Sequence, residues 1–158
     1  MNRIRLRSIN DNDIELMKSW LNKEYILKWY EDPEAWINEI KGRKNEFHFI
    51  SHYIVLQDSK PIGFCQYYTC SYAGEDWYGG TELKGTYSID YLIGEEEFLG
   101  KGYGKEIIEL LVKVIFSIDS AKRIIVLPDP ENKPSVKALL ANGFIFDDIN
   151  SVYLKAKE

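Results

Sequence analysis

The sequence predicts an α/β domain in which helices flank one mixed sheet, and three observations support this class. Segments that alternate polar and apolar residues are interleaved with segments whose apolar residues recur at helical spacing. Turn chemistry, such as DSKPIG at 58–63, separates these segments. The 158 residues contain no repeat, linker or low-complexity tract. One domain over residues 1–158, with a single core, is therefore expected.

The first 40 residues predict a strand and two helices. RIRLRSI (3–9) alternates polar and apolar residues, as a half-buried strand does. Asp11 or Asp13 is a candidate cap for the helix that follows, which has an apolar face. DPEAWINEI (32–40) predicts a second helix, because Asp32 can cap it and a proline occupies its first position.

The middle of the chain predicts a hairpin, a long loop and a further strand. FHFISHYIVLQ (47–57) and GFCQYYTC (63–70) have the composition of strands and flank the turn chemistry. The stretch 71–85 is rich in glycine and acids and predicts a long loop. GTYSIDYLIG (85–94) predicts the next strand.

The last third of the chain predicts two helices that alternate with strands. The first helix has an apolar face made by Ile107, Ile108, Leu111, Val114, Ile115 and Ile118. A short buried strand is expected at 123–127. Asn132 is a candidate cap for a helix that ends at 142–143, and FIFDDINSVYLKAK (144–157) closes the chain as a hairpin.

Charge and hydropathy exclude several classes of partner. The formal net charge is −5 and no basic stripe is present, so nucleic acid is not an expected partner. No apolar run reaches membrane-spanning length, so no membrane association is expected. The start, MNRIRLRSIND, has no apolar signal core, which predicts a cytoplasmic location. An acidic chain suits a cationic small molecule, while monomer and homodimer stay open.

Cysteine and histidine spacing predicts neither a disulfide nor a metal site. Cys65 and Cys70 are five residues apart in one predicted strand, so their side chains should point to opposite faces. Both are expected to be buried and reduced. His48 and His52 would share a strand face, but no third ligand lies nearby in the sequence.

The glycine-rich stretch FLGKGYGKEIIELL (98–111) is a candidate anion-binding site. A turn that leads into a helix offers unsatisfied main-chain N–H groups and the positive end of the helix dipole. Gly100, Gly102 and Gly104 lack Cβ atoms, so an anion such as a diphosphate can approach those donors. The spacing fits neither a Rossmann site nor a P-loop. A flexible turn that binds nothing is the alternative.

Together with the strand before it, this stretch resembles the cofactor-binding core of the GNAT family of acetyl-CoA-dependent N-acetyltransferases. The family pattern is Q/R-x-x-G-x-G/A, and LGKGYG (99–104) matches it at Gly102 and Gly104. Leu99 departs from the usual Gln or Arg. The aminoglycoside 6′-N-acetyltransferase branch of the family shares this departure.

Three other segments resemble the same branch. LMKSWLNKEYILKWY (16–30) resembles its first helix and aromatic pair, and YIVLQDSKPIGFCQYY (53–68) resembles its central hairpin. ENKPSVKALLANGF (131–144) resembles its last helix. The resemblance spans residues 16–144 and implies a mixed, mostly antiparallel sheet that is splayed at the cofactor site and flanked by helices.

The resemblance implies that acetyl-CoA is the cofactor. Its pantetheine arm would lie in the split of the sheet, beside the strand that carries Asp90. Its diphosphate would rest on main-chain amides of the glycine-rich stretch. The implied cofactor-binding residues are Leu92, Ile93, Leu99, Gly100, Lys101, Gly102, Tyr103, Gly104, Lys105 and Asn132.

The resemblance also implies the chemistry. A free alkylamine has a pKa of about 10, so acetyl transfer needs a group that accepts its proton. Asp90 is the implied general base, and a main-chain N–H near Leu92 would stabilise the oxyanion. Many GNAT enzymes protonate the departing thiolate with a tyrosine, but Leu139 occupies that position here. Tyr103, Tyr91 or water would serve instead, or catalysis is poor.

The expected acceptor is an aminoglycoside 6′-amine or a similar polycationic amine. Acids attract ammonium groups, and aromatic faces bind cations and sugar rings. The expected acceptor-binding residues are Trp29, Tyr67, Glu75, Asp76, Trp77 and Asp90. Two alternatives stay open: a GNAT enzyme that acts on a protein N-terminus or a metabolite amine, and a non-catalytic module that binds acyl-CoA.

Overall fold

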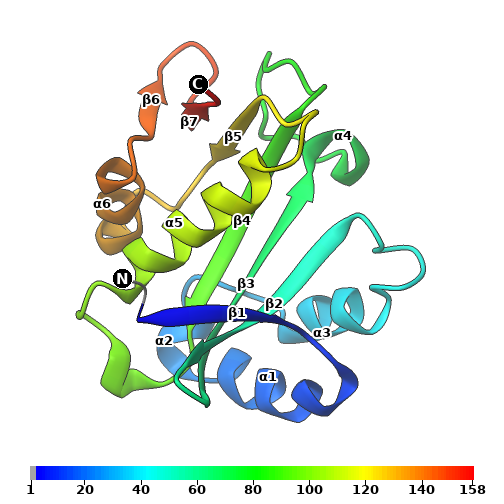
Figure 1. Ribbon diagram of the computed structural model, residues 1–158, viewed down its shortest axis with the longest axis vertical. Helices are drawn as coiled ribbons and strands as arrows, with labels where there is room; N and C mark the ends of the chain where they lie inside the picture. The colour runs from blue at the N-terminus through cyan, green and yellow to red at the C-terminus, as the bar shows by residue number, and fades with distance from the viewer. Residues whose placement is uncertain (1–2) are drawn as a thin grey trace.

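A seven-stranded sheet forms the centre of the molecule in the computed structural model, which describes residues 3–158 (Figure 1). The strands are β1 (Ile4–Ser8), β2 (Ile50–Gln57), β3 (Lys60–Thr69), β4 (Thr86–Ile93), β5 (Arg123–Val126), β6 (Ile145–Asp147) and β7 (Val152–Ala156). Their order across the sheet is β1-β2-β3-β4-β5-β7-β6. The β4–β5 pair is parallel, and the other pairs are antiparallel. The mixed, mostly antiparallel sheet is therefore confirmed.

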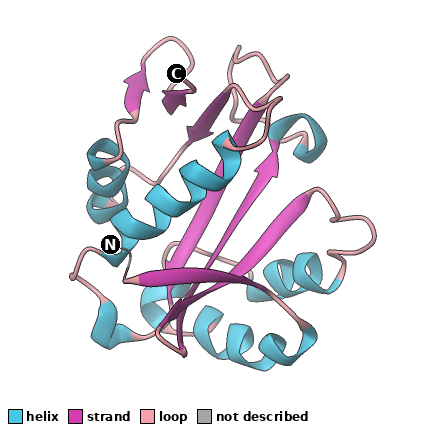
Figure 2. Ribbon diagram, viewed as in Figure 1, coloured by secondary structure: helices cyan, strands magenta, loops and turns pink. Residues whose placement is uncertain are grey.

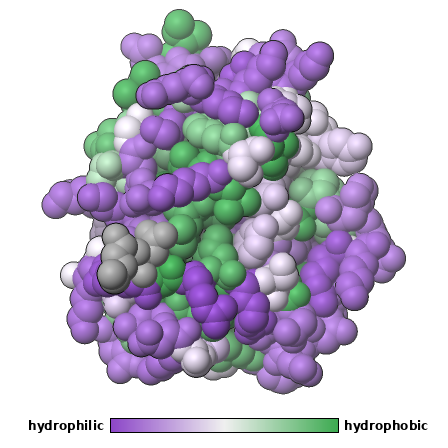
Figure 3. Space-filling model, viewed as in Figure 1, coloured by the Kyte–Doolittle hydropathy of each residue, from purple (hydrophilic) through white to green (hydrophobic). Residues whose placement is uncertain are grey.

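Helices pack on both faces of this sheet (Figure 2). They are η1 (Asp11–Asp13), α1 (Ile14–Leu21), α2 (Glu24–Leu27), α3 (Pro33–Lys41), α4 (Cys70–Ala73), η2 (Glu96–Phe98), α5 (Tyr103–Phe116) and α6 (Lys133–Ala141). Helix α5 packs with Val55 and Ile89 in one core cluster, while α1 and α3 pack with Ile54 and Phe64 in another. Neighbouring strand residues point to opposite faces, so the two clusters lie on opposite sides of the sheet. In Figure 3 apolar side chains gather in the middle of the viewed face, inside a hydrophilic rim.

The predicted caps of the later helices are confirmed, whereas the first cap is different. Asp32 Oδ1 accepts a hydrogen bond from Ala35 N at 3.2 Å, and Asn132 caps α6. The cap of the first helical segment is Asn10 rather than Asp11 or Asp13. Asn10 accepts from a main-chain N–H inside η1, and Asp13 in turn accepts from Asn10 N at 2.8 Å. The sequence interpretation considered only acids and passed over the asparagine before them.

Two predicted boundaries are wrong, and several short helices were not expected. Residues 47–49 form turns and β2 begins at Ile50, so His48 and His52 do not share a strand face. Cys70 begins α4 instead of ending β3, and the expected loop therefore starts with one helical turn. The short helices α2, η1 and η2 were not expected, because three or four residues are too few to show a helical period.

The sheet splays between β4 and β5, as the resemblance implied. The two strands pair only at Thr86–Arg123 and Tyr87–Ile124. From residue 88 to residue 93, β4 keeps β3 as its neighbour on one edge, and its other edge is open. The main-chain groups of this open edge have no strand partner.

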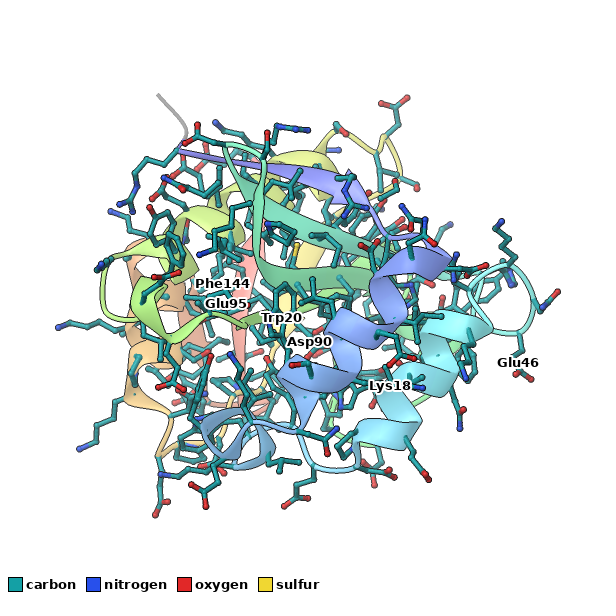
Figure 4. All side chains as sticks on the ribbon, turned by 90° about the horizontal axis from the view of Figure 1, so that it is seen from below. Lys18, Trp20, Glu46, Asp90, Glu95 and Phe144 are labelled. Atoms are coloured by element: carbon teal, nitrogen blue, oxygen red, sulfur yellow. The ribbon has the colours of Figure 1, made fainter. Side chains whose placement is uncertain are left out.

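The end of β4 is anchored to α1. Trp20 Nε1 donates a hydrogen bond to Glu95 Oε2 at 2.6 Å, and both residues are labelled in Figure 4. The Trp20 ring lies where a Cβ at Gly94 would be, so only glycine fits between α1 and the strand end. This packing fixes the position of the open edge relative to α1.

Candidate active site

Asp90 lies on β4 directly opposite Gln66 of β3. Gln66 Nε2 donates a hydrogen bond to Asp90 Oδ2 at 2.9 Å, and Figure 4 shows Asp90 well inside the outline of the molecule. Burial raises the pKa of Asp90 to about 7. The carboxylates of Glu75 and Glu39 also raise this pKa, whereas the Gln66 hydrogen bond lowers it.

A cavity of about 310 Å³ opens beside Asp90 on the α3 side of the sheet. Its lining combines acids with aromatic and apolar side chains. They include Trp36, Glu39, Phe47, Phe49, Gln66, Tyr68, Glu75, Trp77, Ser88 and Asp90. We call this cavity the acidic cavity.

A second cavity, of about 250 Å³, lies along the open edge of β4 and reaches α6. We call it the cleft cavity. Trp29, Tyr30, Tyr91, Asn132, Ser135 and Leu139 contribute to its lining. Asp90 and Trp36 line both cavities. The Asp90 carboxylate is therefore at the junction where a group held in one cavity can meet a group held in the other.

Side chains from the α2 region cover part of the open edge of β4. Tyr30 Oη donates a hydrogen bond to Tyr91 O, and Tyr25 Oη donates to Ile93 O at 2.7 Å. In an antiparallel strand the N–H and C=O of one residue point to the same side. The peptide groups of Tyr91 and Ile93 therefore face the open edge.

Leu92 does not present its main chain to this edge, which corrects its expected role. Its carbonyl oxygen lies against Gly63 of β3, and its side chain is buried in the cluster beneath α1 and α3. The alternation of the strand places Tyr91 and Ile93 on the open side instead. The expected strand is the right one, but the main chain of Leu92 faces β3 and not the open edge.

The glycine-rich stretch forms the turn that enters α5. Gly100 and Gly102 have φ angles of 72° and 85°, and Gly102 is the N-cap of α5 without a side-chain cap bond. A Cβ at Gly100 would meet nothing within 4 Å, and at Gly102 only Arg3 Nη2 at 3.5 Å. The first N–H groups of α5 thus lie next to open space, which suits a bound anion.

Gly104 serves packing as well as access. A Cβ there would lie 3.2 Å from the Tyr91 ring, so glycine lets α5 approach β4 closely. Lys101 and Lys105 are exposed at the turn, and Leu99 is 42% exposed. These three side chains are accessible to a ligand on the turn.

The Tyr103 side chain is not available to a ligand or to a leaving group. It is 5% exposed, packs edge-to-face with Phe98 and lies beneath the Arg3 guanidinium at 4.0 Å. Only its main chain belongs to the turn. Arg3, which the sequence interpretation missed, donates from Nη2 to Lys101 O at 2.9 Å and forms an ion pair with Glu106. It connects the N-terminal strand to the glycine-rich turn.

Of the expected acceptor residues, Glu75 and Trp77 line the acidic cavity together with Asp90. Tyr68 Oη donates a hydrogen bond to Glu75 Oε1 at 3.0 Å, and Tyr78 Oη donates at 3.3 Å. These hydroxyls fix the Glu75 carboxylate at the cavity wall. Asp76 is exposed and does not line the cavity.

Tyr67 lies on the face of β3 opposite the acidic cavity. It stacks on Tyr53 with 6.2 Å between ring centroids and packs against the core beneath α5. Because side chains alternate along a strand, Tyr68 takes its place in the acidic cavity. The choice between two adjacent tyrosines required the register of the sheet.

Trp29 lines the cleft cavity instead of the acidic cavity, with the Lys28 ammonium 4.7 Å above its ring. Two acidic-cavity residues on α3 were missed. Trp36 and Glu39 are three residues apart and share a helix face, a spacing that could have revealed them. Burial and the Glu75 carboxylate raise the pKa of Glu39.

Leu139 is buried on α6 at the wall of the cleft cavity and brings no hydroxyl there. Tyr91 and Tyr30 do line this cavity. Burial raises the pKa of the Tyr30 hydroxyl well above its usual value. Asn132 lines the same cavity at the first turn of α6.

Histidines and cysteines contribute no metal site within residues 3–158, where no group of three or more acids, histidines and cysteines could hold an ion. Cys65 and Cys70 are buried and unpaired, and burial raises the pKa of both thiols. Among the described helices, none has the length and hydropathy to cross a bilayer.

Comparisons with known proteins agree with this geometry. A family model described as acetyltransferase (GNAT) domain matches residues 10–150. Proteins named aminoglycoside N(6′)-acetyltransferase type 1, from Klebsiella pneumoniae and from Serratia marcescens, are each 24% identical over 151 residues. These matches cover 89% of this chain and 73% of each relative.

Solved structures show the same fold. The aminoglycoside acetyltransferase AAC(6′)-Ib in complex with coenzyme A and kanamycin superposes with a TM-score of 0.82 at 22% identity. That match covers 98% of this chain and 95% of the other. An aminoglycoside N(6′)-acetyltransferase from Legionella pneumophila gives a TM-score of 0.74 at 16% identity, with 99% and 94% covered.

Proposed function

Since the chain belongs to the GNAT family of acetyltransferases, we propose that it moves the acetyl group of acetyl-CoA to a primary amine of an aminoglycoside or a similar polycation. The observation that carries the proposal is the position of Asp90, whose carboxylate lies between the acidic cavity and the cleft cavity. An amine in the first and a thioester in the second would meet beside a proton acceptor.

The residues around the cleft cavity fit acetyl-CoA. The open turn at 100–105 offers main-chain N–H groups to a diphosphate. The open edge of β4 offers the N–H groups of Tyr91 and Ile93 to a pantetheine arm, while their carbonyls already accept from Tyr30 and Tyr25. Asn132 lies across the cavity. When bound, the cofactor supplies an activated acetyl thioester.

Asp90 fits the role of general base. An alkylamine has a pKa of about 10 and arrives as an ammonium ion, which a carboxylate can hold and deprotonate. With a pKa of about 7, Asp90 accepts a proton far better than an ordinary aspartate does. Its carboxylate form increases as the pH rises through about 7, so kcat/KM should rise over the same interval.

The acidic cavity suits an acceptor with several ammonium groups. Glu39, Glu75 and Asp90 surround it, and Trp36 and Trp77 offer aromatic faces. Three acids in one cavity exceed what a single amine needs. This excess favours a polycation over a protein N-terminus or a metabolite with one amine.

Leu139 favours a second candidate, a module that binds acyl-CoA without turnover. Its position on the cleft wall lacks the hydroxyl that many family members use to protonate the thiolate. Tyr91 also lines this cavity and supports turnover by another donor, whereas Tyr30 already donates its O–H to Tyr91 O. We place the reaction in the cytoplasm, since both cysteines are unpaired as in proteins of reducing compartments.

The test is thiol release from acetyl-CoA in the presence of kanamycin or tobramycin, followed by mass spectrometry of the product. A gain of one acetyl group on the 6′-amine is expected. The Asp90→Asn variant should lose at least about tenfold in kcat while it still binds acetyl-CoA. Turnover with peptides alone would support the alternative acceptor, and stabilisation by the cofactor without any turnover would support the module.

A further inference from the structure

His52, Gln66 and Asp90 form a row of polar side chains across three neighbouring strands. The register pairs His52 of β2 with Gln66 of β3, and Gln66 with Asp90 of β4. Residues that are directly paired in antiparallel strands point to the same face of the sheet. The row therefore lies on the α1 and α3 side, where His52 is 5% and Gln66 is 2% exposed.

Gln66 is hydrogen-bonded to Asp90 but not to His52. Gln66 Nε2 donates to Asp90 Oδ2, so the amide oxygen of Gln66 is the atom left for another partner. This Oε1 and both ring nitrogens of His52 are buried without a hydrogen-bond partner among residues 3–158. Such atoms are rare in folded proteins because each one costs free energy. The row thus places an unpaired acceptor opposite a side chain that has an unpaired donor.

We propose that neutral His52 holds Gln66 Oε1 through one bridging water, to which its ring N–H donates, and thereby positions the Gln66 amide toward Asp90. With Oε1 held by His52, the amide keeps its NH₂ group on the carboxylate. Without that bond the amide can turn, and an oxygen facing Asp90 favours the protonated carboxyl group. His52 is then a positioning residue for the base of the proposed reaction, and the inference deepens that function.

The surroundings of His52 keep its ring neutral. Burial and, to a smaller extent, the nearby Arg43 guanidinium lower the pKa of His52 to about 4. Arg43, at the end of α3, is itself held by Asp11 Oδ1 at 2.8 Å. A neutral imidazole has one N–H donor and one acceptor nitrogen. One donor matches the single carbonyl oxygen that Gln66 leaves free.

The acids that face Asp90 from other elements act against its ionisation. Glu39 comes from α3 and Glu75 from the loop after α4, and both raise the Asp90 pKa. Tyr68 on β3 and Tyr30 after α2 are the hydroxyls near enough to interact with it. Gln66 is the only one of these neighbours that lowers the pKa of Asp90. The orientation of its amide therefore controls how readily Asp90 ionises.

The first test uses the unaltered protein and the ¹⁵N chemical shifts of its histidine rings. A single neutral tautomer of His52 with a slowly exchanging N–H is expected between about pH 5 and 8. A ring that titrates near its ordinary value, or a mixture of both tautomers, would overturn the inference. His48 is an internal comparison, because it is exposed.

The second test measures the Asp90 pKa by ¹³C NMR of its carboxyl group, assigned with Asp90→Asn. His52→Phe keeps a ring beside Phe64, whose centroid lies 6.0 Å from that of His52, and Gln66→Met removes the amide. Both variants should raise the Asp90 pKa. In each variant the acidic limb of the kcat/KM profile should move to higher pH by as much as that pKa rises. The control His48→Phe should change neither quantity.

The outcomes separate the inference from the proposed function. If Gln66→Met raises the Asp90 pKa but His52→Phe leaves it unchanged, His52 is only a core residue and the inference fails while acetylation stands. If both variants shift the pKa but no amine is acetylated, the proposed function fails, while the inference that His52 positions Gln66 is supported. If His52→Phe does not fold, the ring shifts of the unaltered protein decide.

Discussion

Asp90 illustrates how opposing local effects set one ionisation. Burial and two neighbouring carboxylates raise its pKa, one amide hydrogen bond lowers it, and the result is about 7. An aspartate in water ionises near 3.8. The shift makes this side chain a better proton acceptor, and it also makes the ionised form costly to the folded state.

We therefore predict that Asp90→Asn stabilises the fold at alkaline pH. A carboxyl group whose pKa is raised on folding contributes stability below its unfolded pKa, and this contribution is lost as the pH rises through about 7. Above pH 7 the neutral asparagine avoids that cost, by at least about 1 kcal/mol if one pKa unit is worth about 1.4 kcal/mol.

Thermal unfolding of both proteins at about pH 4 and about pH 8.5 checks this prediction. The midpoint of the variant should exceed that of the unaltered protein by a few degrees at the higher pH, and the gap should narrow at the lower pH. A gap that widens toward acid would contradict the raised pKa.

Glu39 and Asp76 provide a matched pair of acids near the acceptor side. Glu39 lines the acidic cavity, whereas Asp76 is exposed outside it. We predict that Glu39→Gln raises KM for kanamycin about tenfold, because a partly desolvated carboxylate–ammonium contact is worth roughly 1–2 kcal/mol. Asp76→Asn should leave KM within about twofold. Steady-state kinetics compares them, and equal effects would show that overall charge, not the cavity, attracts the acceptor.

Among the elements, α5 and β4 create the cofactor side through what they leave unpaired. Helix α5 begins at a glycine cap that has no side-chain bond, so its first N–H groups stay free. Strand β4 loses its parallel neighbour after Tyr87. The helix start and the strand edge thus both leave main-chain donors open, and Tyr91 of the strand packs against Gly104 of the helix.

Gly102 and Gly143 test the helix start, because both have a φ angle of 85°. Alanine at either position pays a similar backbone cost of about 1–2 kcal/mol. A Cβ at Gly143 would meet only the flexible end of Lys155, at 2.8 Å. We predict that Gly102→Ala weakens coenzyme A binding at least about tenfold while Gly143→Ala binds normally. Calorimetry measures both, and equal affinities would remove the turn from the cofactor site.

On the scale of the whole molecule, two core clusters hold the two cavities in place from opposite faces of the sheet. The cluster beneath α5 supports the glycine-rich turn and the cleft wall at Leu139. The cluster beneath α1 and α3 supports Trp36 and the α3 side of the acidic cavity. Asp90 lies on β4, which contributes Ile89 to the first cluster and Leu92 to the second.

We predict that coenzyme A protects a narrow set of amides from hydrogen exchange. The N–H groups of Tyr91 and Ile93 and those of residues 100–105 should exchange at least about tenfold more slowly when the cofactor is bound. Amides of β1 and β2, which are already paired, should change little. Protection spread evenly over the sheet would indicate general stabilisation instead of binding along the β4 edge.

Much of the fold follows from local signals that a single sequence carries. Asp32 and Asn132 cap their helices because short polar side chains accept from free N–H groups. The glycine-rich stretch enters a helix because its residues suit that turn. It was harder to predict which face of the sheet each side chain occupies. Tyr67 and Tyr68 are adjacent identical residues, so the sequence around them does not show which one faces the acidic cavity.

The sequence by itself determined the order of the seven strands and the four longer helices and the glycine-rich helix start, because each depends on neighbours along the chain. Asp90 on β4 was identified from the family resemblance. Only the tertiary structure decided that Glu39 and Trp36 join Asp90, that Tyr67 and Asp76 do not, and that His52 aligns with Gln66. These relations join residues from different elements. Their distances depend on sheet register and helix packing, which no local spacing contains.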